Sequence, residues 1–239
     1  LTDVSDLGEN LVGQAEFVAE DGTLHALPIT MQGFIVYYNK QRYEEAGLDP
    51  ESPPQTWEEL MAACEAINAA GNVPCFSLGN REGFGGEFFL SALAASSLTA
   101  EQHAAFASGE LKWSSPEISE ILQAWVDTQE SGWYRQGANS TAKFMDEYEQ
   151  FMRGDAANTI GLLSDVAHWK QFDDFLGAEN VGVFRHPAPN MVDGEANLPV
   201  SGGIGYGVNK AGDNVELATA FVEHLASAGP IQTFVNDAG

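Results

Sequence analysis

The chain has 239 residues, with 10 lysines and arginines against 35 aspartates and glutamates, which gives a formal net charge of −25 at pH 7. A surface of that sign repels the phosphates of nucleic acids and anionic lipid headgroups, which argues against binding to either. Hydrophobic residues make up 44% of the chain and aromatic residues 10%. This composition can build a packed core and argues against disorder, and the length fits one large or two small domains.

No run of about 18 apolar residues marks a membrane span, and no basic segment followed by an apolar one marks a signal peptide. The two cysteines, Cys64 and Cys75, lie outside any CxxC or cysteine–histidine metal spacing. They could form one disulfide, or both could be buried as small hydrophobic residues. The sequence leaves both alternatives open.

The first half of the chain alternates strand and helix patterns, which is typical of an α/β fold. Thr56 and Glu59 have the spacing of a capping box, and Thr99 and Gln102 repeat it. The elements predicted here are strands at 23–29 and 33–39, a helix at 40–46, a helix opened by Thr56 and ended at Gly71, a strand at 73–77, a loop at 78–87, a helix at 88–95 and a helix from Thr99 to near Gly109.

The second half continues the alternation. The predicted elements are a helix after Ser115–Pro116, a helix from Phe144 to Gly154, a strand at 159–164, a loop and helix at 165–175, strands at 181–185 and 204–209 around a loop at 187–199, a helix at 214–226 and a last short helix to about Asp237. In the 214–226 helix, Leu217, Phe221 and Leu225 are predicted to share one face. The large aromatic residues expected in the core are Tyr37, Tyr38, Trp57, Trp113 and Trp125.

No motif in the chain specifies catalysis or metal binding. The histidines are scattered, and the sequence has no HExxH, EF-hand, Walker A or GxSxG pattern. The glycines at 202–207 do not lead into a helix, so they fail as a dinucleotide fingerprint. With 35 acids, a carboxylate pair for glycoside hydrolysis stays open, but no single pair stands out.

A more specific pattern begins with GFIVYYNK at 33–40 and continues with YEEAGL at 43–48 and PQTWEEL at 54–60. It resembles the extracellular solute-binding proteins of bacterial ABC importers, of the maltose-type family 1. The segments FMRGDAA at 151–157 and SGG…GVNK at 201–210 continue the resemblance in the same order. Together these segments cover most of the chain.

The resemblance implies an α/β fold of the periplasmic-binding-protein type II, in which two lobes close by a hinge. Family members are longer, so we interpret the chain as a fragment with most of one lobe and part of the other. The expected organisation is the end of the first lobe and a first hinge crossing at 1–32, the second lobe at 33–184, a second hinge crossing at 185–189 and a return to the first lobe at 190–239. A signal peptide would then lie outside this fragment.

The resemblance further implies a non-enzymatic component of an ABC importer, located in the periplasm or anchored as a cell-surface lipoprotein. It would capture a small polar solute, with a mono- or oligosaccharide as the first expectation, and deliver it to the permease subunits in the membrane. We expect a monomer with no cofactor, no metal and no nucleic-acid partner. The alternatives are a binding protein for a polyamine or peptide and, behind it, a glycoside hydrolase.

Sugar recognition combines aromatic faces with planar hydrogen-bonding groups, and the resemblance points to nine candidate residues of this kind. Phe84 is the predicted stacking platform, with loop packing as the alternative. Asp165 is the predicted acceptor for hydroxyls or a cation, with a helix N-cap as the alternative. The glycine pair is predicted either to admit the ligand close to the backbone or to form a plain turn. The candidate ligand-binding residues are Gln32, Asn80, Arg81, Phe84, Ser164, Asp165, Trp169, Gly202 and Gly203.

Overall fold

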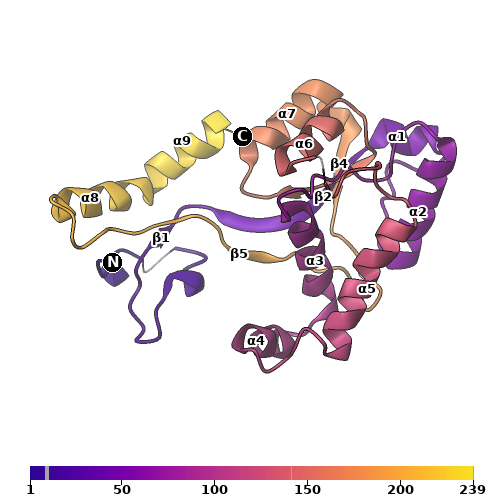
Figure 1. The fold of residues 1–239 in the computed structure, drawn as a ribbon. Helices are drawn as coiled ribbons and strands as arrows, with labels where there is room; N and C mark the ends of the chain where they lie inside the picture. The colour runs from indigo at the N-terminus through magenta and orange to yellow at the C-terminus, as the bar shows by residue number, and fades with distance from the viewer. Residues whose placement is uncertain (9–10, 141, 239) are drawn as a thin grey trace. The chain divides into compact units, whose positions relative to one another are not determined.

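A computed structural model describes residues 1–8, 11–140 and 142–238 and contains both helices and strands (Figure 1). Three short 3-10 turns, at Ser5–Leu7, Ala15–Phe17 and Ala178–Asn180, accompany them in these ranges. The elements are β1 (Leu27–Pro28), β2 (Met31–Asn39), α1 (Lys40–Glu45), α2 (Trp57–Ala70), α3 (Phe84–Ser97), α4 (Ala100–Ser108), α5 (Pro116–Glu130), α6 (Phe144–Met152), β3 (Asn158–Leu162), α7 (Val166–Leu176), β4 (Val181–Phe184), β5 (Val200–Gly202), β6 (Gly205–Tyr206), α8 (Val215–Leu225) and α9 (Ala228–Ala238).

The chain divides into two compact units. Unit 1 consists of Leu1–Gly33, Leu162–Lys170 and Val200–Gly239, and unit 2 consists of Phe34–Gly161 and Gln171–Pro199. These units differ from the predicted lobes at 162–170 and at 190–199. The division into lobes that move about a hinge stays a prediction.

The sheet of unit 2 is built around β2, the long strand predicted from the GFIVYYN run. Its last four residues pair antiparallel with β4, from Val36 opposite Phe184 to Asn39 opposite Val181, and β3 lies on its other side. At the end of the strand the side chain of Asn39 accepts hydrogen bonds from the first amides of α1. The strand therefore ends where a helix cap begins, as the sequence predicts for a strand followed directly by a helix.

Helices surround this sheet, and two of them begin with the predicted capping boxes. The Thr56 side chain accepts from the Glu59 amide while the Glu59 carboxylate accepts from the Thr56 amide, and Thr99 and Gln102 repeat the arrangement at α4. Helices α3 and α5 run side by side (Figure 1). The aromatic core beneath them includes Phe76 stacked on Trp133, with ring centroids 5.4 Å apart.

Cys64 of α2 and Cys75 form a disulfide, with their Cα atoms 5.0 Å apart. This settles one of the two alternatives that the sequence leaves open. Both cysteines are fully buried. The bridge links α2 to the segment that leads into the loop at 78–83. The start of this loop, which carries candidate residues of unit 2, is therefore held to α2 by a covalent bond.

His186 also lies in the core of unit 2. It is 2% exposed, and its ring meets Phe89 edge to face at a centroid distance of 4.5 Å. Nδ1 lies 2.7 Å from the carbonyl oxygen of Pro187, which can only accept, so Nδ1 carries the proton. Nε2 has no hydrogen-bond partner among the described residues, and burial lowers the pKa of His186 from 6.5 to about 4.

Unit 1 has its own small core of Val4, Leu24, Leu27, Val208, Val222 and Ala226. Strand β1 pairs antiparallel with β6, and the first three residues of β2 pair antiparallel with β5. Leu217 and Phe221 share one face of α8, as predicted, but that face is open to solvent. Leu217 is 71% exposed and Phe221 56% exposed, because the helix packs through Val222 and its helical neighbours instead.

Three further expectations need correction. The predicted strand at 73–77 makes only one isolated bridge, from Phe76 to Asn158. Trp113 is not a core residue: it is 67% exposed, and Phe106 meets its ring edge to face at 4.9 Å, so only part of the indole is covered. The predicted loop at 78–87 is too long, because α3 already begins at Phe84. Two of the four glycines that made this stretch read as a loop, Gly85 and Gly86, lie in the first turn of that helix.

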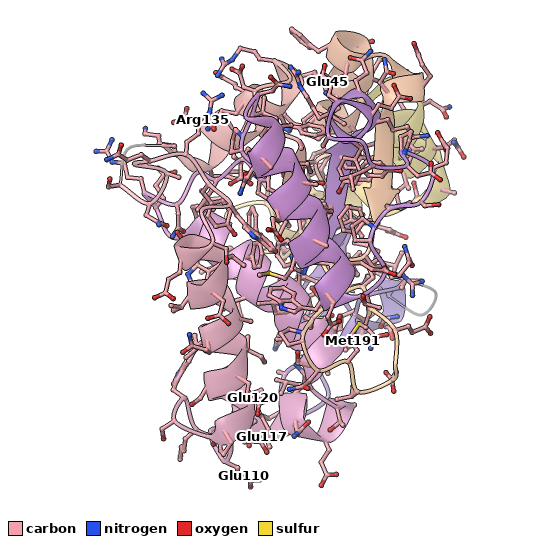
Figure 2. The ribbon with its side chains drawn as sticks, turned by 90° about the vertical axis from the view of Figure 1, so that its right-hand side faces the viewer. Glu45, Glu110, Glu117, Glu120, Arg135 and Met191 are labelled. Carbon is pink, nitrogen blue, oxygen red and sulfur yellow. A yellow bond between two sulfur atoms is a disulfide. The ribbon has the colours of Figure 1, made fainter. Side chains whose placement is uncertain are left out.

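The acidic excess is visible on the surface. Figure 2 labels three of these acids, Glu110, Glu117 and Glu120, and Glu117 lies in the first turn of α5. Acids at a helix N-terminus are favourable because they face the positive end of the helix dipole. Within the described ranges, no cluster of histidine, cysteine or acidic residues could hold a metal ion, and no helix is long and apolar enough to cross a membrane.

Candidate ligand-binding site

Three of the nine candidate residues lie together in unit 2, where residues 78–83, called here the site loop, lead into α3. Backbone bonds fix this loop at successive positions. The Asn80 amide donates to the carbonyl of Ala138 at 3.1 Å, and the Arg81 amide donates to the carbonyl of Ala142 at 3.0 Å. The loop is therefore held along its length by the segment that precedes α6.

The Asn80 side chain has an internal structural role. Its Oδ1 accepts from the Gly86 amide at 2.8 Å, and its Nδ2 donates to Oδ1 of Asn139 at 2.9 Å. The first bond satisfies an amide of the first turn of α3, which has no partner within the helix. Both ends of the side-chain amide are thus engaged within the unit, and its role toward a ligand stays a prediction.

Phe84 and Arg81 present their side chains to solvent. Phe84, the first residue of α3, is 46% exposed, and its ring lies beside Phe88 and Phe144 at centroid distances of 6.3 and 6.1 Å. The ring therefore packs against two aromatic neighbours, while nearly half of the residue is open to solvent. Arg81 is exposed and forms no ion pair within the described part of the chain. An aromatic face and a free guanidinium therefore lie within three residues of each other.

The other six candidates lie in unit 1. The register places Gln32 opposite Ser201 and Met31 opposite Gly202. On the other side of β2, the Leu163 amide donates to the carbonyl of Gly33 at 2.9 Å, which brings Ser164 and Asp165 to the same end of the strand. Gln32 is half-buried, and its side chain makes no hydrogen bond to any residue that the structure describes.

The two glycines have a structural reason to be glycine. A Cβ at Gly202 would collide with the backbone carbonyl of Gly13, and a Cβ at Gly203 would lie 2.6 Å from Oγ1 of Thr30. The Gly203 amide also donates to the Thr30 carbonyl at 2.8 Å. The close approach that these residues permit is therefore made by the protein itself, and an approach by a ligand stays a prediction.

Asp165 and Trp169 flank the start of α7. The Asp165 amide donates to the Leu162 carbonyl at 3.1 Å, and its carboxylate lies 3.9 Å from Nδ1 of His168. The indole Nε1 of Trp169 donates to the same Leu162 carbonyl at 3.1 Å. Trp169 is half-buried and is tied to the end of β3, so a stacking role would use the part of its ring left open.

Sequence reasoning missed one residue that contacts the site loop directly. Glu147 of α6 is 2% exposed, and its Oε2 accepts from the Gly79 amide at 2.9 Å. Burial raises the pKa of this carboxyl well above its usual value. A signal was present in the sequence, because Glu147 lies three residues after Phe144 and four before Phe151 and so shares the apolar face of its helix.

The structure thus brings Asn80, Arg81 and Phe84 together in unit 2, and the remaining six candidates together in unit 1. The role of each of the nine toward a ligand stays a prediction. The two groups differ in chemistry, since unit 2 offers an aromatic face with a cation and unit 1 offers an amide, a hydroxyl, a carboxylate and an indole.

Two curated proteins that are similar to this chain carry the same name. The chain is 28% identical over 208 residues to the sn-glycerol-3-phosphate-binding periplasmic protein UgpB of Brucella abortus (strain 2308), covering 80% of this chain and 43% of that protein. It is 29% identical over 196 residues to the protein of the same name from Yersinia pestis, covering 77% of this chain and 42% of that one. The chain therefore spans less than half the length of these relatives.

Solved structures agree on the fold. A chitin oligosaccharide binding protein matches 98% of this chain and 57% of its own, with a TM-score of 0.81 and 22% identity. A Thermotoga lettingae ABC transporter solute-binding protein bound with α-D-tagatose matches 100% of this chain and 61% of its own, with a TM-score of 0.75 and 22% identity. The fold is that of the type II binding proteins, and this chain contains part of that fold. The model of the bacterial extracellular solute-binding proteins matches residues 2–231, and the chain belongs to that family.

Proposed function

We propose that this chain is part of the substrate-binding component of an ABC importer, which captures a small polar solute and delivers it to a membrane permease. The family match over residues 2–231 carries this proposal. The solute class that we favour is a mono- or oligosaccharide. Solved structures of similar fold are named for binding chitin oligosaccharide, raffinose and tagatose, which supports this choice.

The open face of Phe84 supports sugar binding in physical terms. A pyranose ring has an apolar C–H face that stacks on an aromatic ring and a polar rim that needs donors and acceptors. Arg81 offers donors within three residues of that ring. These residues are the ones to which we assign ligand contacts.

We further propose that the protein acts outside the cytoplasm as a monomeric, non-enzymatic binding protein. The curated relatives are named as periplasmic proteins. The Cys64–Cys75 disulfide supports the same location, because disulfides persist in oxidising compartments and are rare in the cytosol. Membrane anchoring as a lipoprotein belongs to the same proposal.

A thermal-shift screen tests the solute class. The panel holds chitobiose, raffinose, tagatose, sn-glycerol 3-phosphate, spermidine and a tripeptide, each at millimolar concentration. We expect a rise in melting temperature with at least one sugar, because a ligand that binds only the folded state stabilises it by mass action. A shift with spermidine or the tripeptide alone would refute the sugar assignment. Release of p-nitrophenol from aryl glycosides would refute the non-enzymatic role.

Phe84→Ala tests the stacking platform. We expect the affinity for the responding sugar to fall by about fivefold, in line with the loss of an aromatic contact of about 1 kcal/mol. Trp113→Ala is the matched control, since Trp113 is also an exposed aromatic of unit 2 and lies outside the site loop. Equal affinities for wild type and Phe84→Ala would remove Phe84 from the ligand site.

A phosphorylated polyol is a second candidate ligand, favoured by Arg81, which forms no ion pair with the described residues, and by the names of the curated relatives. A guanidinium free of carboxylates can form a bidentate pair with a phosphate. Arg81→Gln should then weaken binding of sn-glycerol 3-phosphate more strongly than it weakens binding of raffinose. Unchanged affinity for the phosphate ester would exclude this role of Arg81.

A further inference from the structure

Glu147 differs from every other anchor of the site loop. The Asn80 and Arg81 amides donate to backbone carbonyls, and the Gly83 amide donates to the carbonyl of Asn80. Only the Gly79 amide, among the described anchors, donates to a side chain that can ionise. The loop is therefore sensitive to protonation at one point.

The carboxyl of Glu147 is enclosed by the loop and by the start of α3. A Cβ at Gly85 would lie 3.2 Å from its Oε2, and a Cβ at Gly79 would collide with the Lys143 carbonyl at the start of α6. Helix α6 and the site loop are therefore in direct contact at Gly79, with the buried carboxyl beside them. No space for a larger residue is left at that point.

No cation compensates this carboxyl within the described ranges. Among the described residues, the Gly79 amide donates a hydrogen bond to it, whereas a buried carboxylate is stable when two or three donors or a cation reach it. Four charged residues on the surrounding elements have exposed side chains. A fifth, Asp146, accepts a hydrogen bond from the Lys143 amide. The nearby Tyr134, which can also titrate, is buried. The four exposed residues are Arg81, Glu82, Glu87 and Lys143.

We propose that Glu147 is a pH-dependent positioning residue: its neutral carboxyl holds the site loop through Gly79, and its ionisation loosens that loop. An ionised carboxylate with one donor must gain water. Helix α6 is fixed by its own backbone bonds, so the loop is the part that moves to admit the water. The raised pKa of Glu147, caused by burial, supports a neutral carboxyl in the folded protein. The link to ligand binding rests on the function proposed above.

Amide hydrogen exchange measured by NMR from pH 6 to pH 9 tests this inference. In the wild type we expect the protection factors of the Gly79, Asn80 and Arg81 amides to fall by about tenfold or more across this range, relative to amides in α5, as expected for a lost buried bond. Glu147→Gln keeps the acceptor oxygen and cannot ionise, so its protection factors should stay constant with pH. Glu147→Met removes the acceptor and should lower protection at every pH.

Glu149→Gln is the matched control, because Glu149 lies on the same helix with its side chain exposed. It should reproduce the wild-type profile. The inference is overturned if the wild type and Glu147→Gln have the same pH profile. Should Glu147→Gln fail to fold, a wild-type protection profile that does not change with pH overturns it equally.

A second readout separates this inference from the proposed function. The affinity for the sugar that responds in the thermal-shift screen is measured at pH 6 and pH 9 for the wild type and Glu147→Gln. A wild-type affinity that falls with pH while that of Glu147→Gln stays constant supports both. If the loop amides respond to pH and the affinity does not, Glu147 keeps its positioning role, and the assignment of the site loop to the ligand site is refuted.

Discussion

Replacing His186 by phenylalanine should change the pH dependence of stability in unit 2. In the wild type, Nδ1–H of His186 donates a hydrogen bond to the Pro187 carbonyl. Nε2 lies among aromatic rings and has no hydrogen-bond partner among the described residues. Protonating Nε2 would place a cation and an unsatisfied N–H in that apolar site. The folded state therefore resists the proton that the unfolded chain accepts readily.

The magnitude follows from the difference between the two pKa values. His186 has a pKa of about 4 in the folded state against 6.5 as its ordinary value. At 1.36 kcal/mol for each unit of pKa, this difference corresponds to about 3 kcal/mol. Above pH 6.5 the residue is neutral in both states and contributes no pH dependence. Between pH 6.5 and 4 only the unfolded state gains the proton, so stability falls as the pH falls, and below pH 4 the loss is complete.

The assay is urea unfolding followed by tryptophan fluorescence at pH 7.5, 6, 5 and 4. His186→Phe keeps a ring against Phe89 and loses the bond to Pro187, so at pH 7.5 it should lie within about 1 kcal/mol of the wild type. At pH 4 it should be more stable than the wild type by about 3 kcal/mol. His103→Gln, at an exposed position on α4, is the control and should follow the wild type. A difference between wild type and His186→Phe that stays constant from pH 7.5 to 4 would refute the reasoning.

Glu147→Gln should show the opposite pH dependence of stability in the same urea series. Because burial raises the pKa of Glu147, the wild type should lose stability relative to this variant as the pH rises above 4.5. A stability difference that stays constant with pH would contradict the burial argument. Replacing both Cys64 and Cys75 by alanine should lower the free energy of unfolding by about 3 kcal/mol, the value expected for a closed loop this short, and an unchanged urea midpoint would count against it. Gly202→Ala should lower the free energy of unfolding by about 1–3 kcal/mol, because the new Cβ would collide with the backbone of Gly13. A Cβ at Gly229 would have no atom within 4 Å, so Gly229→Ala should not destabilise the chain. Equal melting temperatures for the two glycine variants would exclude this explanation.

The sequence predicted best what neighbouring residues determine. The capping boxes at Thr56 and Thr99 were predicted correctly, because a cap is a bond between residues three positions apart. The strand at β2 was also predicted, since a continuous apolar run with β-branched and aromatic residues needs no distant partner to be identified. The start of α3 was missed because Gly85 and Gly86 have the composition of a loop. Their reason to be glycine is contact with Leu78 and Asn80, which sequence alone does not place there.

The remaining errors concern which side of an apolar element is covered. Helix α8 carries apolar residues on more than one side, and the sequence cannot tell that Val222 faces the core while Leu217 and Phe221 do not. Trp113 was assigned to the core from the spacing of the elements, although its loop position leaves it on the surface. For the candidate site, the resemblance indicated which loops matter. It could not show that the Asn80 side chain bonds within the protein or that Glu147 anchors the site loop from a separate helix.

The disulfide between α2 and the segment before the site loop also has a topological consequence. It closes a covalent ring that begins at Cys64 and ends at Cys75, and the exposed turn at Gly71 and Asn72 lies inside that ring. A protease that cuts this turn breaks the backbone without separating the two pieces. The cleaved chain would migrate as one species on a non-reducing gel and as two after reduction, with the site loop still bound covalently to the helix that precedes it.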